Sequence, residues 1–151
     1  MHVDSQAPAY VSGEKLVNAP AQVVWEVVSR IEEWPTWNPD VQKATLDGAL
    51  AAGTAFRWQA GRAKITSRLE EVTAPTVIGW SGKLPGIAAR HVWRIEPRGD
   101  QTLVSTQESW HGIVPRIFRA RSRKMLQAAV DSGLQAIKDE VERRMAVGRN
   151  Q

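Results

Sequence analysis

The feature that most constrains this chain is a series of short hydrophobic segments between residues 41 and 111, separated by turn-forming residues. The segments are 41–46, 54–60, 63–73, 76–84, 87–98 and 101–111. Between them lie Asp47-Gly48, Gly61-Arg62, Ala74-Pro75, Pro85-Gly86 and Gly99-Asp100. Glycine, proline and aspartate at this spacing are typical of turns between neighbouring strands. The pattern therefore predicts six consecutive antiparallel strands joined by local connections.

The turns also predict which side chains share a face of the sheet. In an antiparallel pair, directly opposed residues lie on one face, and the turn centre fixes which residues oppose each other. Centring four turns at 61/62, 74/75, 85/86 and 99/100 yields one apolar and one polar face. The four hairpins agree on which face is apolar, and a shift of one residue in any of them would remove this agreement. The apolar face consists of Phe56, Trp58, Ile65, Ser67, Leu69, Ile78, Trp80, Gly82, Ala89, His91, Trp93, Ile95, Val104, Thr106, Glu108 and Trp110.

Helical patterns lie on both sides of the strand region. Residues 10–17 are typical of one more strand, and apolar residues at helical spacing follow over 24–31. The segment 34–39 contains two prolines, which predicts the end of that helix. A long helix is predicted from Pro115 to about Arg144. Strand, helix, six strands and a long helix together predict an α+β fold with helices on one face of an antiparallel sheet.

Length and composition predict a single globular domain. The chain has 151 residues, of which 42% are hydrophobic and 24% charged, which excludes a disordered chain. We expect a domain over 10–145, a flexible tail at 1–9 and a C-terminal tail at 146–151. No apolar stretch is long enough to span a membrane, and the N-terminus lacks the pattern of a signal peptide. The chain has no cysteine, which excludes disulfides and thiolate sites, and we expect a cytoplasmic protein.

Small residues on the expected inner surfaces predict a cavity between the sheet and the last helix. Close packing of helix on sheet also uses glycine and alanine, but it would not need four tryptophans on the same face. The small residues are Ser67, Gly82 and Ala89 in the strands, and Ser122, Ala129 and Gly133 in the helix.

The order and spacing of several motifs resemble those of the START-related SRPBCC superfamily, in its polyketide cyclase/dehydrase-like branch. The motifs are Asn18-Ala19-Pro20, Val23-Val24-Trp25, Trp34-Pro35-x-Trp37-Asn38-Pro39, Gly53-Thr54-x-Phe56 and Thr102-x-Val104-x-x-x-Glu108. Over residues 10–145 the resemblance implies a helix-grip fold, a seven-stranded antiparallel sheet wrapped around a long C-terminal helix with a hydrophobic cavity. Members bind lipids, sterols, plant hormones or polyketides, and only some are enzymes. The resemblance also implies that Glu108 lines the pocket and that Asn38 lies near a polar pocket position.

His91 and Glu108 are predicted to oppose each other on the inner face. Three interpretations remain open for this pair. The two side chains could anchor a ligand hydroxyl or carbonyl, act as a general acid and base, or only satisfy each other. No spacing of metal ligands and no phosphate-binding glycine motif is present, so we expect neither a metal nor a cofactor.

Basic residues concentrate between Arg116 and Lys124, at the expected start of the last helix. The helix dipole disfavours cations there, so helix stability does not explain them. The run could contact an anionic ligand group near the pocket mouth, or make a weak contact with an anionic membrane or an acidic partner. A solvated helix face is the other interpretation. We expect no nucleic acid binding.

The sequence thus predicts a soluble binding protein for a lipid-like, aromatic or polyketide-like molecule, as a monomer or homodimer. One alternative is a polyketide cyclase or dehydratase that uses His91 and Glu108 as acid and base. Another is a protein-interaction module that uses residues 116–124. The predicted ligand-contacting residues are Trp37, Asn38, Phe56, Trp58, Ser67, Leu69, Ile78, Trp80, His91, Trp93, Thr106, Glu108, Trp110, Phe118, Ser122, Met125 and Ala129.

Overall fold

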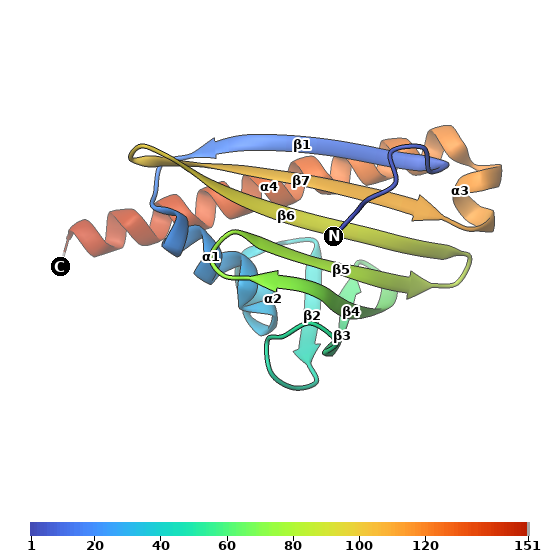
Figure 1. The fold of residues 1–151 in the computed structure, drawn as a ribbon, viewed down its shortest axis with the longest axis horizontal. Helices are drawn as coiled ribbons and strands as arrows, with labels where there is room; N and C mark the ends of the chain where they lie inside the picture. Colours follow the sequence, from blue (N-terminus) through green and yellow to red (C-terminus); the bar gives the residue numbers. More distant parts are fainter. Residues whose placement is uncertain (151) are drawn as a thin grey trace.

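The strands form almost where the turns predict them. A computed structural model describes residues 1–150 and contains a seven-stranded antiparallel sheet in the order β1-β7-β6-β5-β4-β3-β2 (Figure 1). The strands are β1 (Ala9–Val17), β2 (Val41–Leu46), β3 (Ala55–Ala60), β4 (Ala63–Thr73), β5 (Val77–Leu84), β6 (Ile87–Arg98) and β7 (Gln101–His111). Each hairpin strand pairs with the next along the chain, and β1 closes the order beside β7.

The predicted register is confirmed with one correction. Trp80 opposes Leu69 on one side and His91 on the other, and His91 opposes Glu108, as the turn centres predict. The exception is a bulge between Leu69 and Glu71, beyond which Val72 rather than Glu71 opposes Ile78. An extra residue in one strand reverses the alternation of faces, so an apolar side chain occupies the predicted place of a carboxylate.

The first helical region is divided into short pieces. They are α1 (Ala21–Ser29), the 3₁₀ turn η1 (Ile31–Glu33) and α2 (Trp34–Trp37). We predicted that the segment 34–39 ends the helix, but part of it forms α2. Proline is accepted in the first turn of a helix because its missing N–H would have no partner there, and Pro35 occupies such a position.

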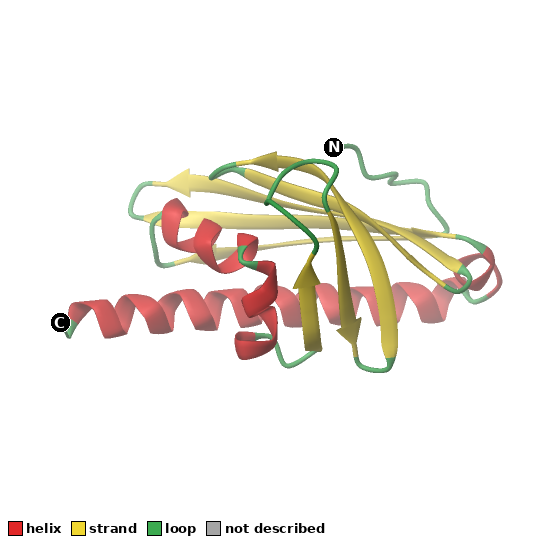
Figure 2. Cartoon of the chain, turned by 90° about the horizontal axis from the view of Figure 1, so that it is seen from below, coloured by secondary structure: helices red, strands yellow, loops and turns green. Residues whose placement is uncertain are grey.

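The C-terminal helix begins and ends later than predicted and is preceded by a separate short helix. The two are α3 (Ile113–Ile117) and α4 (Arg119–Arg149). The backbone of Phe118 lies outside the helical region (φ −110°, ψ 55°) and separates them, so Pro115 belongs to α3 and does not begin the long helix. Figures 1 and 2 show α4 running along one face of the sheet, with the strands curving around it.

The segment before β1 lies on the outer face of the sheet, where we predicted a flexible tail. The Met1 amine pairs with Glu71, which the bulge turns outward. Arg90 donates a hydrogen bond to the His2 carbonyl (2.9 Å), and Val3 is buried. No helix within residues 1–150 combines the length and hydrophobicity needed to cross a membrane.

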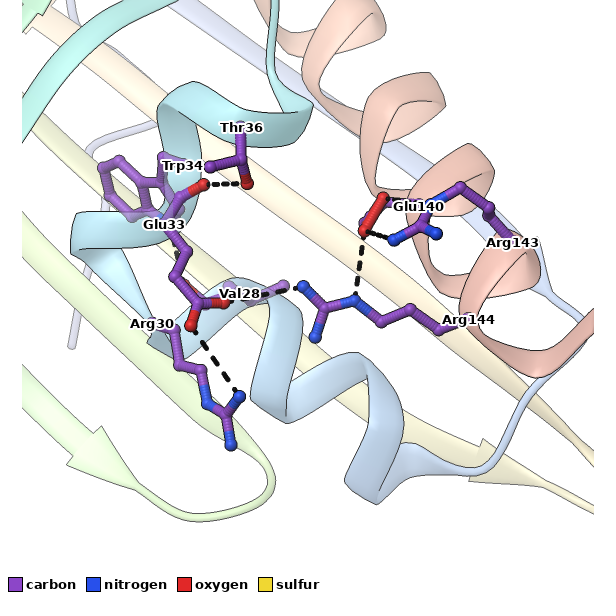
Figure 3. A network of polar contacts seen from close by, with 8 residues as sticks. All are labelled: Val28, Arg30, Glu33, Trp34, Thr36, Glu140, Arg143 and Arg144. Carbon is purple, nitrogen blue, oxygen red and sulfur yellow. Dashed lines mark hydrogen bonds and ion pairs between the residues drawn. The ribbon is translucent and has the colours of Figure 1, made fainter. Parts of the chain in front are cut away.

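A network of polar contacts lies where the η1–α2 segment meets the C-terminal half of α4 (Figure 3). Arg144 lies between two carboxylates, with its Nε 3.1 Å from Glu140 Oε1 and its Nη2 3.6 Å from Glu33 Oε2. Next to Glu33, the indole of Trp34 is buried and donates a hydrogen bond to the Val28 carbonyl (3.0 Å). The Arg144–Glu33 contact links η1 to α4, and the Trp34 hydrogen bond fixes α2 against α1.

Candidate functional site

A cavity of about 540 Å³ lies between the inner face of the sheet and α4. This volume falls within the range of about 300–1,000 Å³ that is usual for small-molecule sites. Its walls are mainly apolar and include the small residues Ser67, Gly82 and Ala89, where bulkier side chains would fill a packed core. The predicted cavity is therefore confirmed.

Most of the predicted ligand-contacting residues line this cavity. They are Trp37, Asn38, Trp58, Ser67, Trp80, His91, Trp93, Glu108, Trp110, Phe118, Ser122, Met125 and Ala129. Phe56, Leu69, Ile78 and Thr106 do not line it, because they are buried within the core around it.

Several lining residues were not predicted as ligand contacts. Trp34 lies in the segment 34–39, from which only Trp37 and Asn38 were predicted to contact a ligand, and Asp40 directly follows it. Arg121 lies in the basic run 116–124. Ile87 and Val114 line the cavity near the turn between β5 and β6. The aromatic pair around Pro35 was the one available signal for Trp34, since its partner Trp37 was already in the predicted set.

The polar centre of the cavity wall is the pair His91 and Glu108. The Nδ1 atom of His91 lies 3.3 Å from Oε2 of Glu108. The other carboxylate oxygen accepts a hydrogen bond from Trp110 Nε1 (3.2 Å). On the far side of the imidazole, Nε2 lies 2.8 Å from the hydroxyl of Thr106, which donates to the Val92 carbonyl (2.9 Å).

This chain of contacts fixes where the imidazole carries its proton. The Thr106 hydroxyl donates its single hydrogen to the Val92 carbonyl. It can therefore only accept a hydrogen bond from His91, so Nε2 of His91 must carry the proton. In neutral His91, Nδ1 then presents a lone pair to Oε2 of Glu108. Two facing lone pairs would repel, so a proton belongs between these two atoms.

Burial controls the charge of the pair. It lowers the pKa of His91 to about 3 and raises the pKa of Glu108 to about 7, although the hydrogen bond from Trp110 opposes the second shift. Both side chains are about seven-eighths shielded from solvent, with exposures of 12% and 15%. A neutral imidazole beside a carboxyl that changes charge near neutral pH can accept, donate or hold a proton within the cavity.

Aromatic rings surround the imidazole and cause its desolvation. The ring centroids of Trp80 and Trp93 lie 4.9 and 5.1 Å from that of His91. Trp34 and Phe56 extend the cluster, each within 6 Å of Trp80. Trp34, Trp80 and Trp93 thus form an apolar part of the cavity wall next to the pair, and Phe56 packs behind Trp80.

Two other polar side chains of the wall, Ser67 and Asn38, make hydrogen bonds within the protein. Ser67 accepts a hydrogen bond from Trp58 Nε1 (3.0 Å), and Asn38 accepts one from the backbone of Asp40 (3.0 Å). Asn38 therefore shapes its own loop in addition to lining the cavity. The Nε1 atom of Trp37 is buried, and the described part of the chain offers it no hydrogen-bond partner.

The cavity opens along the N-terminal half of α4. Phe118 and Met125 both line it and are each 56% exposed, and Arg121 and Ala129 are also exposed lining residues. No group of three or more potential metal ligands occurs within residues 1–150.

Comparisons with known proteins agree with the motifs in the sequence. Residues 8–142 match the family described as polyketide cyclase / dehydrase and lipid transport. Curated protein sequences contain no significant match.

Three solved structures illustrate the similarity of fold. A hypothetical protein, jhp0584, from Helicobacter pylori has a TM-score of 0.80 at 15% identity, with 91% of this chain and 90% of that chain covered. A START superfamily protein from Mycobacterium smegmatis has a TM-score of 0.76 at 17% identity, with coverages of 89% and 97%. The Zhui aromatase/cyclase from Streptomyces sp. R1128 has a TM-score of 0.70 at 22% identity, with coverages of 90% and 94%.

At such identities the structures establish the fold, whereas the family match extends over most of the chain. The chain therefore belongs to the polyketide cyclase/dehydrase and lipid transport family.

Proposed function

We propose that this protein binds a largely apolar, ring-containing small molecule in the cavity, with one hydroxyl or carbonyl group of the ligand held at Glu108. The observation that carries this proposal is a mainly apolar cavity of about 540 Å³ whose wall contains one buried ionisable pair, His91 and Glu108. Pockets of this kind bind ligands by apolar contact and orient them with a few polar groups.

The walls favour a ligand with flat rings. Trp58, Trp80, Trp93 and Trp110 contribute broad aromatic surfaces from β3, β5, β6 and β7. Aromatic side chains interact with other rings in stacked or edge-on arrangements beyond the area that they bury. Small residues at Gly82 and Ala89 leave the space that such rings need.

The ionisable pair favours one polar group on the ligand. Because burial raises the pKa of Glu108 to about 7, both charge states of the carboxyl are populated near neutral pH. A ligand carbonyl can replace His91 Nδ1 as the acceptor of the Glu108 proton, and the carboxylate can accept a hydrogen bond from a ligand hydroxyl. The charged form makes the stronger of the two hydrogen bonds.

A polyketide cyclase or dehydratase is the second candidate, and the same pair favours it. A general base works best when its pKa lies near the operating pH, as that of Glu108 does. In a cyclisation, the Glu108 carboxylate would remove a proton from a carbon next to a ketone. The enolate would attack a second carbonyl of the same molecule, and the resulting alkoxide would recover the proton from Glu108.

A cavity-filling variant tests the binding proposal. Ala89→Leu adds bulk to the cavity wall, whereas Ala88→Leu adds the same bulk at an exposed neighbour on the same strand. We expect the neutral probe N-phenyl-1-naphthylamine to quench tryptophan emission saturably in the native protein and in Ala88→Leu. Its affinity should fall at least about tenfold in Ala89→Leu, since a filled cavity excludes the probe. Equal affinity in all three proteins would refute the site.

Native mass spectrometry separates the two candidate functions. A molecule that co-purifies with the protein and is recovered unchanged after prolonged incubation supports binding. A poly-β-ketone that is converted to a ring by the native protein, but not by Glu108→Gln, supports the enzyme.

A further inference from the structure

We propose that the α3–α4 corner docks onto an anionic lipid bilayer, with the cavity opening facing the membrane. We call this region the mouth surface and define it by Ile113, Arg116, Ile117, Phe118, Arg119 and Arg123. This inference goes beyond ligand binding, because it concerns the membrane to which the protein binds.

The mouth surface exposes large apolar side chains. Ile113 and Ile117 are 62% and 63% exposed and lie one helical turn apart on α3, and Phe118 follows at 56%. Figure 1 shows α3 at one end of the molecule, beyond the strand ends. Apolar side chains exposed together at a projecting corner are characteristic of surfaces that become buried in an interface.

The same corner carries a strong positive charge. Arg116, Arg119, Arg121, Arg123 and Lys124 are all exposed, and no acidic residue occurs between Gly112 and Val130. Within residues 1–150, none of the five basic side chains takes part in an ion pair. Most lie in the first turns of α4, where the helix dipole disfavours cations, so an external anion is the partner that fits them.

A bilayer fits this corner better than a protein does. Long basic side chains around a small apolar tip match an anionic lipid surface, in which the tip enters the headgroup region and the cations remain at the phosphates. A second copy of the chain would bring two clusters of like charge together. A stable protein interface buries about 800 Å² per partner, which a five-residue helix cannot supply alone.

Docking at this corner would bring the cavity opening to the lipid. Phe118, at the junction of α3 and α4, belongs to both the mouth surface and the cavity wall. Arg121 and Met125 continue the lining from there along α4. An apolar ligand would then exchange between bilayer and cavity with little exposure to water.

The absence of cysteine allows insertion to be measured at single positions. Ile117→Cys carries the environment-sensitive dye NBD at the mouth surface, and Val147→Cys carries it at an exposed apolar position near the other end of α4. On vesicles of phosphatidylcholine with phosphatidylglycerol, we expect dye emission to increase and shift to the blue at 117 but not at 147. Vesicles of phosphatidylcholine alone should produce a much smaller change, and salt should weaken the response.

Charge reversal tests the electrostatic part of the surface in a sedimentation assay with the same vesicles. Arg116→Glu/Arg119→Glu and Lys43→Glu/Arg149→Glu change the net charge equally, but only the first pair lies on the mouth surface. Each basic residue near an anionic bilayer contributes about a fivefold factor, so the first variant should bind at least about 30-fold more weakly than native protein. The second should bind nearly as well as native protein.

Three outcomes would overturn the proposal. They are no binding of the native protein to anionic vesicles, equal loss in the two charge-reversal variants, and equal dye responses at 117 and 147. Binding to an acidic protein that depends on Arg116 and Arg119, without binding to vesicles, would assign the surface to a protein partner instead. Each readout is independent of probe binding in the cavity, so failure here leaves the proposed function to its own test.

Discussion

At its C-terminal end α4 carries ion pairs, one of which joins it to η1, whereas the basic side chains at its N-terminal end make no ion pair within residues 1–150. Arg143 and Arg144 contact Glu140, and Arg144 also reaches Glu33. Beside them Trp34 is 6% exposed, while Phe118 at the other end is 56% exposed. Trp34 and Phe118 both line the cavity, but the first is buried in protein and the second is open to solvent.

The difference assigns different roles to the two ends. Buried aromatic contacts and paired charges at the C-terminal end stabilise the fold. Exposed apolar groups and unmatched charges at the N-terminal end add little stability, and such features on a protein surface are characteristic of contact sites. The C-terminal end of α4 therefore serves to stabilise the fold, whereas the side chains at its N-terminal end remain available for contacts with other molecules.

The largest expected effect is a contrast in stability between Trp34→Ala and Phe118→Ala. Trp34 packs edge-on against Phe56 and Trp58, and its loss should lower the free energy of unfolding by roughly 3–5 kcal/mol. Phe118→Ala should cost less than about 1 kcal/mol, because more than half of the side chain is already in solvent. Urea unfolding monitored by circular dichroism measures both. Similar losses would contradict the comparison.

The second prediction concerns Glu108 at the centre of the cavity, and whether it stabilises the fold, as the C-terminal end of α4 does, or weakens it. Burial raises the pKa of Glu108 from 4.5 to about 7, so the folded state binds this proton more tightly than the unfolded state does. The contribution of Glu108 to stability is complete below about pH 4.5 and decreases as the pH rises through 7. A buried carboxyl that destabilises the fold at neutral pH is typical of a functional position.

Glu108→Gln removes this titration but keeps an acceptor for Trp110 and a donor for His91. Relative to native protein, the variant should therefore gain up to about 3 kcal/mol between pH 4.5 and 8. The low pKa of His91 acts in both proteins, so its contribution largely cancels in the difference. Urea unfolding across this pH range measures the change.

Glu140→Gln is the matched control. Hydrogen bonds from Arg143 and Arg144 lower the pKa of Glu140, so its contribution is present above pH 4.5 and is lost in acid. Its difference from native protein should thus change with pH in the opposite direction. A pH-independent difference for Glu108→Gln would show that the carboxyl titrates normally in the folded protein.

The sequence predicts the centre of the site better than its ends. Alternation of side chains along strands carries the register across each turn, and this placed His91 opposite Glu108. The bulge near Glu71 was missed because no glycine or proline marks it. The contacts of Thr106 and Trp110 with the pair depend on side-chain rotamers, which strand periodicity does not specify.

The two ends of the cavity along α4 were harder to predict, because their structure depends on contacts between segments that are distant in the sequence. Glu33 and Arg144 are far apart in the sequence, and no local pattern indicates that they meet. The break at Phe118 was missed because favourable helical residues lie on both sides of it. Arg121 was counted with the surface charges, since its place at the cavity depends on where α4 begins.

The smallest expected effect compares two arginines of α4, each replaced by alanine so that the change in net charge is the same. Arg144 is 24% exposed and lies between two carboxylates, and its removal should cost about 1 kcal/mol in urea unfolding. Arg119 lies in the first turn, where a cation opposes the helix dipole, and its removal should raise stability by a few tenths of a kcal/mol.

Acid should reduce the difference in stability between these two variants by acting on only one of them. The pKa of Glu140 is lowered by Arg143 and Arg144, so the stabilisation that depends on its charge is lost as the pH falls below 4.5. The cost of Arg144→Ala should therefore decrease in acid, while the gain from Arg119→Ala should not, because backbone dipoles do not titrate. Equal costs for both variants at neutral pH would mean that the two ends of α4 do not differ in the way that their ion pairs indicate.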